Sequence, residues 1–178
     1  MRYLFIIVTA FIVSNCEAAS TDTAEVYKTY SYNTWCLRSE TGINKAYFKS
    51  LGISRRRYER DDHHFASFLA YACAEVNMAT YNNPNSFFYG YKGGVEYSSM
   101  GMMMAFEIHG FTDFNGKEHA YFTPKYGFSL SGLMSLLYGY NCFQVHNNVF
   151  GIGRHQVTLS INYSPKLWKE YLSPIDTK

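Results

Sequence analysis

Cys36 and His119 are the two residues whose types could together perform covalent chemistry. A thiolate is a strong nucleophile, and a cysteine hydrolase needs an imidazole within hydrogen-bond reach to accept and return the proton. Cys36 begins a segment with helical spacing, where the helix dipole and unpaired amide groups would stabilise a thiolate. His119 begins a segment that reads as a strand and would hold the imidazole rigidly. The pair predicts a cysteine hydrolase; the plainer alternative is a buried thiol and a surface histidine.

The elements that would position this pair fall into a helical part followed by a strand part. The expected elements are helices at 36–51 and 65–79, a hairpin over 102–123, a short helix at 129–138, and strands at 145–152 and 155–163. This order predicts a single α+β domain, in which N-terminal helices pack on a mostly antiparallel sheet.

The first 18 residues have the three regions of a secretory signal peptide. Arg2 supplies the positive charge, an apolar run covers 4–13, and Ala18 precedes the expected cleavage site. Cleavage would leave one domain over 19–178, located outside the cell or in a periplasm. No second apolar stretch reaches the length of a spanning helix, so we expect a soluble mature protein with no membrane span. We also expect it to be a monomer.

The net charge bears on the possible partners, and the number of cysteines bears on whether a free thiol is present. The net charge of +2 is too small to favour a nucleic-acid partner. Cys36, Cys73 and Cys142 would remain after cleavage, and an odd number of cysteines in an oxidising compartment means that at least one is free or pairs with another chain. If one disulfide forms, we expect it to join Cys73 to Cys142 and to leave Cys36 free.

Several short motifs resemble those of NlpC-type and CHAP-type cysteine peptidases, and most closely the amidase effectors of bacterial type VI secretion. The stretch from Asn33 to Arg38 is similar to the motif around the effector cysteine, and Gly52 follows at the expected helix end. Glu118 and His119 correspond to the later Gly-His element, with glutamate in place of glycine. The resemblance covers about residues 30–125.

This resemblance implies a papain-like or NlpC-like fold and cleavage of amide bonds in the peptide stems of peptidoglycan, with no cofactor. Cys36 would be the nucleophile and His119 the general base. The family usually orients its histidine with an acidic residue, and this chain has no clear counterpart. Asp113, Tyr121 and His146 remain alternatives for that role.

A tyrosine- and asparagine-rich stretch over 81–97 supports a second, non-enzymatic hypothesis. Tyr89, Tyr91 and Tyr97 could stack on sugars or contact a protein partner, as in a secreted binding or immunity module. The same side chains would equally suit the wall of a substrate groove in an amidase.

Two further hypotheses concern a zinc site and a different class of enzyme. His63 and His64 with His109 or His119 could supply three zinc ligands, although adjacent histidines rarely point the same way, and we expect no metal site. Arg38 loosely resembles the arginine element of toxin-type ADP-ribosyltransferases, whose acidic motif is missing here.

Asn162 lies in a glycosylation sequon that is followed by Pro165. The sequence leaves open whether this asparagine carries a glycan.

Overall fold

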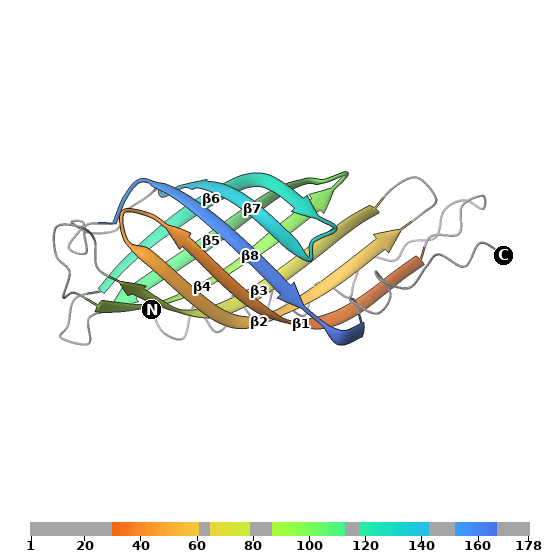
Figure 1. The fold of residues 1–178 in the computed structure, drawn as a ribbon, viewed down its shortest axis with the longest axis horizontal. Coiled ribbons are helices and arrows are strands. Elements are labelled where there is room, and N and C mark those ends of the chain that lie inside the picture. The colour runs from red at the N-terminus through yellow and green to blue at the C-terminus, as the bar shows by residue number, and fades with distance from the viewer. Residues whose placement is uncertain (1–29, 61–64, 79–86, 113–117, 143–151, 167–178) are drawn as a thin grey trace.

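The chain folds into a closed barrel of antiparallel strands (Figure 1). The structure is a computed structural model, and it describes residues 30–60, 65–78, 87–112, 118–142 and 152–166. The strands are β1 (Tyr30–Ile43), β2 (Tyr47–Arg60), β3 (Phe65–Met78), β4 (Phe87–Ser99), β5 (Met102–Thr112), β6 (Glu118–Leu130), β7 (Met134–Tyr140) and β8 (His155–Tyr163).

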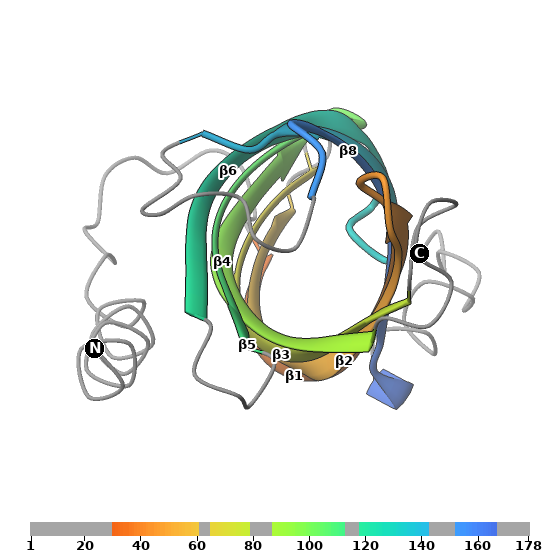
Figure 2. The same cartoon turned by 90° about the vertical axis from the view of Figure 1, so that its left-hand side faces the viewer.

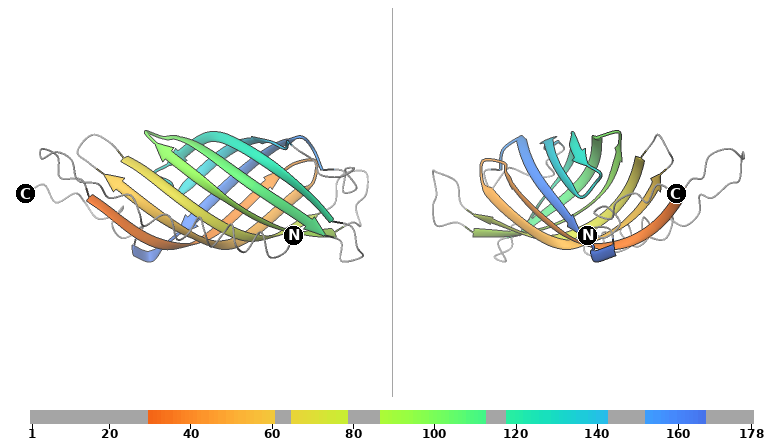
Figure 3. Two further views of the ribbon diagram at one scale, coloured as in Figure 1. Left: turned by 180° about the vertical axis from the view of Figure 1, so that it is seen from behind. Right: turned by 45° about the vertical axis from the view of Figure 1, so that its right-hand side comes forward.

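Each strand pairs with the next one along the chain, and β8 returns to pair with β1 (Figure 2). The closing ladder runs from Leu37 opposite Tyr163 to Ile43 opposite Val157. Closure leaves no free sheet edge along this ladder, so backbone donors and acceptors are satisfied within the sheet. The strands run obliquely to the long axis of the barrel (Figure 3).

The antiparallel order gives the barrel two different ends. We call the end where β1 begins and β8 ends the terminal end, and the opposite end the loop end. The connections at the terminal end are 61–64, 100–101 and 131–133. Those at the loop end are 44–46, 79–86, 113–117 and 141–154, so the longer connections lie there.

Strict alternation of apolar and polar residues explains why the chain forms strands. In β8, Val157, Leu159 and Ile161 alternate with polar residues, which gives the period of two that a strand requires. Val157 and Ile161 are 50% and 40% exposed, whereas the polar residues between them are buried in the barrel interior. The apolar face therefore points outward, the reverse of the pattern in a water-soluble protein.

Glycines admit large side chains into the interior and form one of the tight turns. A Cβ atom at Gly94 would lie 2.9 Å from the hydroxyl of Tyr71, so only glycine leaves room for this ring. Gly101 closes the short connection between β4 and β5 with a φ of +82°, a conformation that glycine adopts without strain.

The predicted α+β, papain-like fold is wrong. The segment predicted as a helix at 36–51 runs along β1, through the hairpin at 44–46 and into β2, and the segment predicted at 65–79 contains β3. The helix predicted at 129–138 is the end of β6, a turn and most of β7. Within the described parts of the chain, no helix is long and apolar enough to cross a membrane.

The error has a physical cause in the composition of the strands. In β3 the inward side chains include Leu69, Tyr71 and Cys73, while small alanines occupy several outward positions, so apolar residues lie on both faces. Apolar positions on both faces can be matched to a helical period as well as to a strand period. The hairpin predicted over 102–123 is confirmed by the pairing of β5 with β6, and the strand at 155–163 is confirmed as β8.

Candidate functional site

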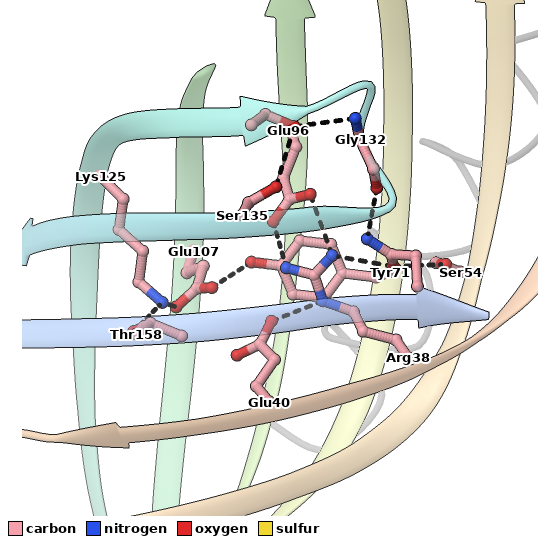
Figure 4. A network of polar contacts seen from close by, with 12 residues as sticks. Arg38, Glu40, Ser54, Tyr71, Glu96, Glu107, Lys125, Gly132, Ser135 and Thr158 are labelled. Carbon is pink, nitrogen blue, oxygen red and sulfur yellow. Dashed lines mark hydrogen bonds and ion pairs between the residues drawn. The ribbon is translucent and has the colours of Figure 1, made fainter. Parts of the chain in front are cut away.

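A network of charged side chains fills the middle of the barrel (Figure 4). Arg38 is its centre: its Nε donates to Glu40 Oε1 at 2.5 Å, and its Nη1 donates to Glu96 Oε2 at 2.9 Å. A second guanidinium nitrogen also bonds to Glu96, which makes the pair bidentate. The guanidinium carbon lies 3.9 Å from the centroid of the Tyr71 ring. One arginine thus ties three strands together across the interior.

Lys92 extends the network from β4 toward the loop end. Its ammonium group donates to Glu40 and lies 3.1 Å from Glu75 Oε2. The same nitrogen lies 4.8 Å from the centroid of the Phe48 ring. Lys92 therefore joins carboxylates from β1 and β3, and all of these groups are buried.

Glu107 on β5 gathers the other side of the network. It accepts hydrogen bonds from the Tyr71 hydroxyl and from Lys125, whose Nζ lies 2.6 Å from Oε2. The imidazole of His109 also lies 2.6 Å from Oε2. Lys125 donates further to Thr158 Oγ1 at 3.2 Å, which links β6 to β8.

The buried charges balance one another. The inward-facing cations Arg38, Arg56, Lys92 and Lys125 are matched by the carboxylates Glu40, Glu75, Glu96 and Glu107. Buried charges are costly unless they are paired and hydrogen-bonded, and this network supplies such pairing. Each of these groups is at most 3% exposed, so the arrangement is built to hold strands together, and a dissolved substrate has no access to it.

The connection at 131–133 folds into the terminal end of the barrel. Arg56 donates to the carbonyl oxygen of Gly132, and Asn162 Nδ2 donates to the same oxygen at 3.0 Å. The backbone nitrogen of Asn162 donates to Leu133 at 2.8 Å, and the Leu133 side chain is buried. This turn therefore occupies the interior at the terminal end.

Aromatic residues occupy the interior at the loop end. Phe88, Phe111 and Tyr121 form a buried cluster with Ala46 and Ile152. The ring centroids of Phe88 and Phe111 are 5.5 Å apart, and those of Phe111 and Tyr121 are 5.3 Å apart. The interior thus holds an aromatic cluster beside polar residues such as Asn77 and His119 at the loop end, a charged network in the middle, and a turn at the terminal end.

The outside of the barrel carries an apolar belt. Every strand contributes to it, and on most strands the outward residues leave about half of their surface exposed. Representative members, one from each strand, are Leu37, Ile53, Val76, Tyr97, Ile108, Phe128, Leu136 and Ile161. Exposed apolar surface on water-soluble monomers rarely exceeds a single small patch, whereas this belt encircles the molecule.

Aromatic residues are frequent toward both ends of this belt. Tyr47, Phe87, Tyr89 and Tyr140 lie toward the loop end, and Trp35, Tyr97, Phe128 and Tyr163 lie toward the terminal end. Leu51, Ile53, Ile108 and Leu136 lie between these groups. Phe106 also lies in the middle of the belt, so aromatic rings are enriched at the two ends but are not confined to them. Enrichment of Tyr and Trp at two levels matches the two interfaces of a bilayer, and Leu, Ile and Phe between them match its hydrocarbon core.

Charged residues are almost excluded from the outward face. Among strand residues whose side chains the structure describes, outward Lys, Arg, Asp and Glu occur on β2 alone, as Lys49, Arg55, Arg57 and Glu59. Three of them lie toward the terminal end of that strand, where Arg57 Nη2 is 3.0 Å from Glu59 Oε1. The middle of the belt therefore remains uncharged.

The structure does not bring the predicted nucleophile and base together. Cys36 lies halfway along β1, and its buried side chain faces the interior. The next residue, Leu37, pairs with Tyr163 at the end of β8. His119 is the second residue of β6, at the loop end, and its ring packs edge-on against Tyr121 with centroids 4.9 Å apart. β1 and β6 are not neighbours in the sheet. Because Cys36 lies within a strand, it has no helix N-terminus to stabilise a thiolate.

Three other residues were predicted to orient the histidine. Tyr121 faces the interior beside His119, whereas Asp113 and His146 lie outside the described residues.

The three predicted groove residues, Tyr89, Tyr91 and Tyr97, are 46%, 45% and 48% exposed on the outward face of β4. They therefore belong to the apolar belt, on the opposite face of the sheet from Cys36.

The predicted disulfide is not present, because Cys73 and Cys142 are both free thiols. Cys73 faces the interior from the middle of β3, whereas Cys142 follows the end of β7, and β3 and β7 are not neighbours in the sheet. The side chain of Asn162 is fully buried and hydrogen-bonded, so the folded barrel offers no room for a glycan there.

Of the histidines weighed as zinc ligands, His63 and His64 lie outside the described residues. Within the described ranges, no group of three or more His, Cys, Asp or Glu side chains is placed to hold a metal ion.

No protein-family model, curated protein or solved structure matches this chain. The resemblance to amidase effectors therefore remains a prediction without independent support, and the fold that it implied is contradicted.

The residues that define the interior were missed in the sequence, although a signal for them was present. Arg38 and Glu40 alternate with outward residues of β1, and Glu107 and His109 alternate with Phe106 and Ile108. Charged residues at every second position between large apolar residues indicate a sheet with a polar inner face.

Proposed function

We propose that the protein is an integral β-barrel of an outer membrane, and that it is anchored by the apolar belt. The observation that carries this proposal is the inverted pattern of the barrel, with paired charges inside and apolar side chains on the outside of every strand. In a bilayer each backbone polar group must be satisfied within the protein, and a closed barrel meets this requirement.

A bilayer is the partner that fits a belt of this shape. A protein partner would cover one side of the barrel, whereas apolar side chains are exposed all the way round. A transmembrane strand needs roughly 9–11 residues when it is strongly tilted. Seven of the strands have 9 to 14 residues, and β7 is shorter. The signal peptide predicted for residues 1–18 would supply export to such a membrane.

The lengths of the connections favour one orientation. Outer-membrane barrels have short turns on the periplasmic side and longer loops on the outer side. By this rule the terminal end faces the periplasm, and the loop end, with the long connection 141–154, faces outward.

The filled interior favours an anchored barrel over an open pore. Arg38 and its partners cross the middle, the turn containing Gly132 fills the terminal end, and Phe111 and its neighbours fill the loop end. The amidase hypothesis is not retained, because its fold is contradicted and its two catalytic groups lie on separate strands. The expectation of no membrane span came from a search for an apolar helix, and alternating strands contain no such stretch.

The proposal is tested by the behaviour of the protein in membranes and in detergent. The full chain, expressed with its own signal in a bacterium with two membranes, should remain in the membrane pellet after alkaline carbonate extraction. In dodecyl sulfate, the unheated protein should migrate faster than the boiled protein, because a hydrogen-bonded closed barrel resists this detergent until it is heated. Recovery in the soluble fraction with no change of mobility on heating would contradict the proposal.

A further inference from the structure

A cluster of basic residues lies at the loop end, beside the hairpin between β1 and β2. Lys45 in this hairpin, Lys49 on β2 and Arg154 just before β8 are all exposed. Figure 2 shows this end of the barrel, where the hairpin lies next to the start of β8. We call these three residues the rim patch.

Backbone contacts fix two of these residues side by side. The nitrogen of Gly153 donates to the carbonyl oxygen of Asn44 at 2.6 Å, and Asn141 donates to that of Arg154 at 2.7 Å. A Cβ atom at Gly153 would lie 3.0 Å from Lys45 Cγ, so the lysine stem lies against the residue before Arg154. The rim patch is therefore held on an ordered part of the loop end.

Lys49 connects the rim patch to the lipid-facing surface. It lies between Tyr47 and Leu51 on the outward face of β2, and its Nζ is 5.9 Å from the centroid of the Tyr47 ring. A lysine at this depth extends its ammonium group toward the interface, where the head groups lie.

Among the side chains that the structure describes, none supplies a negative charge to the rim patch. None of its three cations forms an ion pair with a described side chain. Glu59 is the only exposed carboxylate among the described side chains, and it lies toward the terminal end with Arg57. Two cations beside the β1–β2 hairpin and a third on the adjoining outward face of β2 give this side of the loop end a positive charge that favours an anionic ligand.

We propose that the rim patch binds the phosphate group of an anionic lipid in the leaflet at the loop end. This inference rests on the proposed function, because it requires the belt to lie in a bilayer. A lipid fits better than a dissolved phosphate ion, since Lys49 and Tyr47 project from the lipid-facing surface. The acyl chains would then contact Leu51 while the phosphate lies among the three cations.

The test compares lipid retention by variants at the two ends of the barrel. Wild type and Lys45→Gln/Lys49→Gln/Arg154→Gln are refolded into phosphatidylcholine vesicles that contain phosphatidylglycerol. They are then extracted in mild detergent and analysed by native mass spectrometry for bound phosphatidylglycerol. Because each cation near an anionic surface changes affinity roughly fivefold, the triple variant should retain this lipid roughly tenfold to hundredfold more weakly. Arg55→Gln/Arg57→Gln is the matched control and should stay close to wild type.

The outcomes separate this inference from the proposed function. If wild type and triple variant both insert, shown by heat-dependent mobility, but retain phosphatidylglycerol equally, the lipid site is refuted and the membrane barrel stands. Equal loss in the Arg55/Arg57 control would likewise refute a site at the rim patch. Displacement of the lipid by equimolar inorganic phosphate would show a site for the free ion and refute the lipid. Failure of the wild type to insert would overturn both proposals.

Discussion

At the scale of single residues, Arg38 is the group on which the interior depends most. It contacts both Glu40 and Glu96 and stacks on Tyr71, and it is fully buried. Removal of one member of a buried ion pair leaves an uncompensated charge, which costs more than the pair itself contributes. The arginine therefore links β1 to β3 and β4 through side-chain contacts.

We predict that Arg38→Met lowers the free energy of unfolding by about 3–5 kcal/mol, because it leaves buried carboxylates unpaired. Arg38→Met/Glu96→Gln should recover part of this loss, since one of those carboxylates is then neutral. Leu37→Met, at the neighbouring outward position, is the control and should change stability by less than ~0.5 kcal/mol. Urea unfolding of the refolded barrel in vesicles measures all three; a single variant as stable as Leu37→Met would argue against the network.

At the scale of elements, the turn at 131–133 shows how a connection can contribute to the interior. Gly132 has a φ of +68°, and its carbonyl oxygen accepts hydrogen bonds from Arg56 and Asn162. The glycine at 101 also has a positive φ, but a Cβ atom there would meet nothing within 4 Å. The two turns therefore differ in packing and not in backbone conformation.

We predict that Gly101→Ala costs about 1 kcal/mol, from the left-handed conformation alone. Gly132→Ala should cost at least ~1 kcal/mol more, because its methyl group would collide with the Arg56 guanidinium. The urea midpoints of the two variants give the comparison. Equal losses would mean that the turn does not pack against Arg56.

The sequence predicted some of these elements and concealed others. The hairpin over 102–123 and the strand at 155–163 were predicted, because large apolar residues there are dense or alternate clearly. β3 was taken for a helix, because outward alanines such as Ala72 are small and inward residues such as Leu69 are apolar. Cys36 and His119 gave a plausible catalytic pair in sequence, but only the pairing of strands shows that they lie far apart around the barrel.

At the scale of the whole molecule, polarity is distributed as a membrane requires. The charged network holds the strands from inside, and the apolar belt with its aromatic ends faces outward. The alternation of charged and large apolar residues in β1 and β5 is the sequence signal for both features, but the ion pairs across the interior depend on which strands lie opposite one another and follow only from the fold. The signal peptide predicted for residues 1–18 agrees with this account. A soluble exported protein would carry the same signal, so the membrane location is argued from the barrel itself.

The central claim, that the belt lies in lipid, is tested most directly by the depth of single tryptophans. Trp35 is 58% exposed toward the terminal end of the belt, and Trp168→Phe leaves it as the only tryptophan. Phe106 is 50% exposed at the middle of β5, so Phe106→Trp in a Trp35→Phe/Trp168→Phe background reports the centre of the belt.

Both proteins are refolded into vesicles whose lipids carry bromine at defined depths along the acyl chain. The account predicts that tryptophan at position 106 is quenched most by bromine near the chain ends, and Trp35 by bromine near the head groups, because aromatic residues at the ends of the belt lie at the interface. Quenching of both by aqueous iodide, with no effect of brominated lipid at any depth, would contradict it.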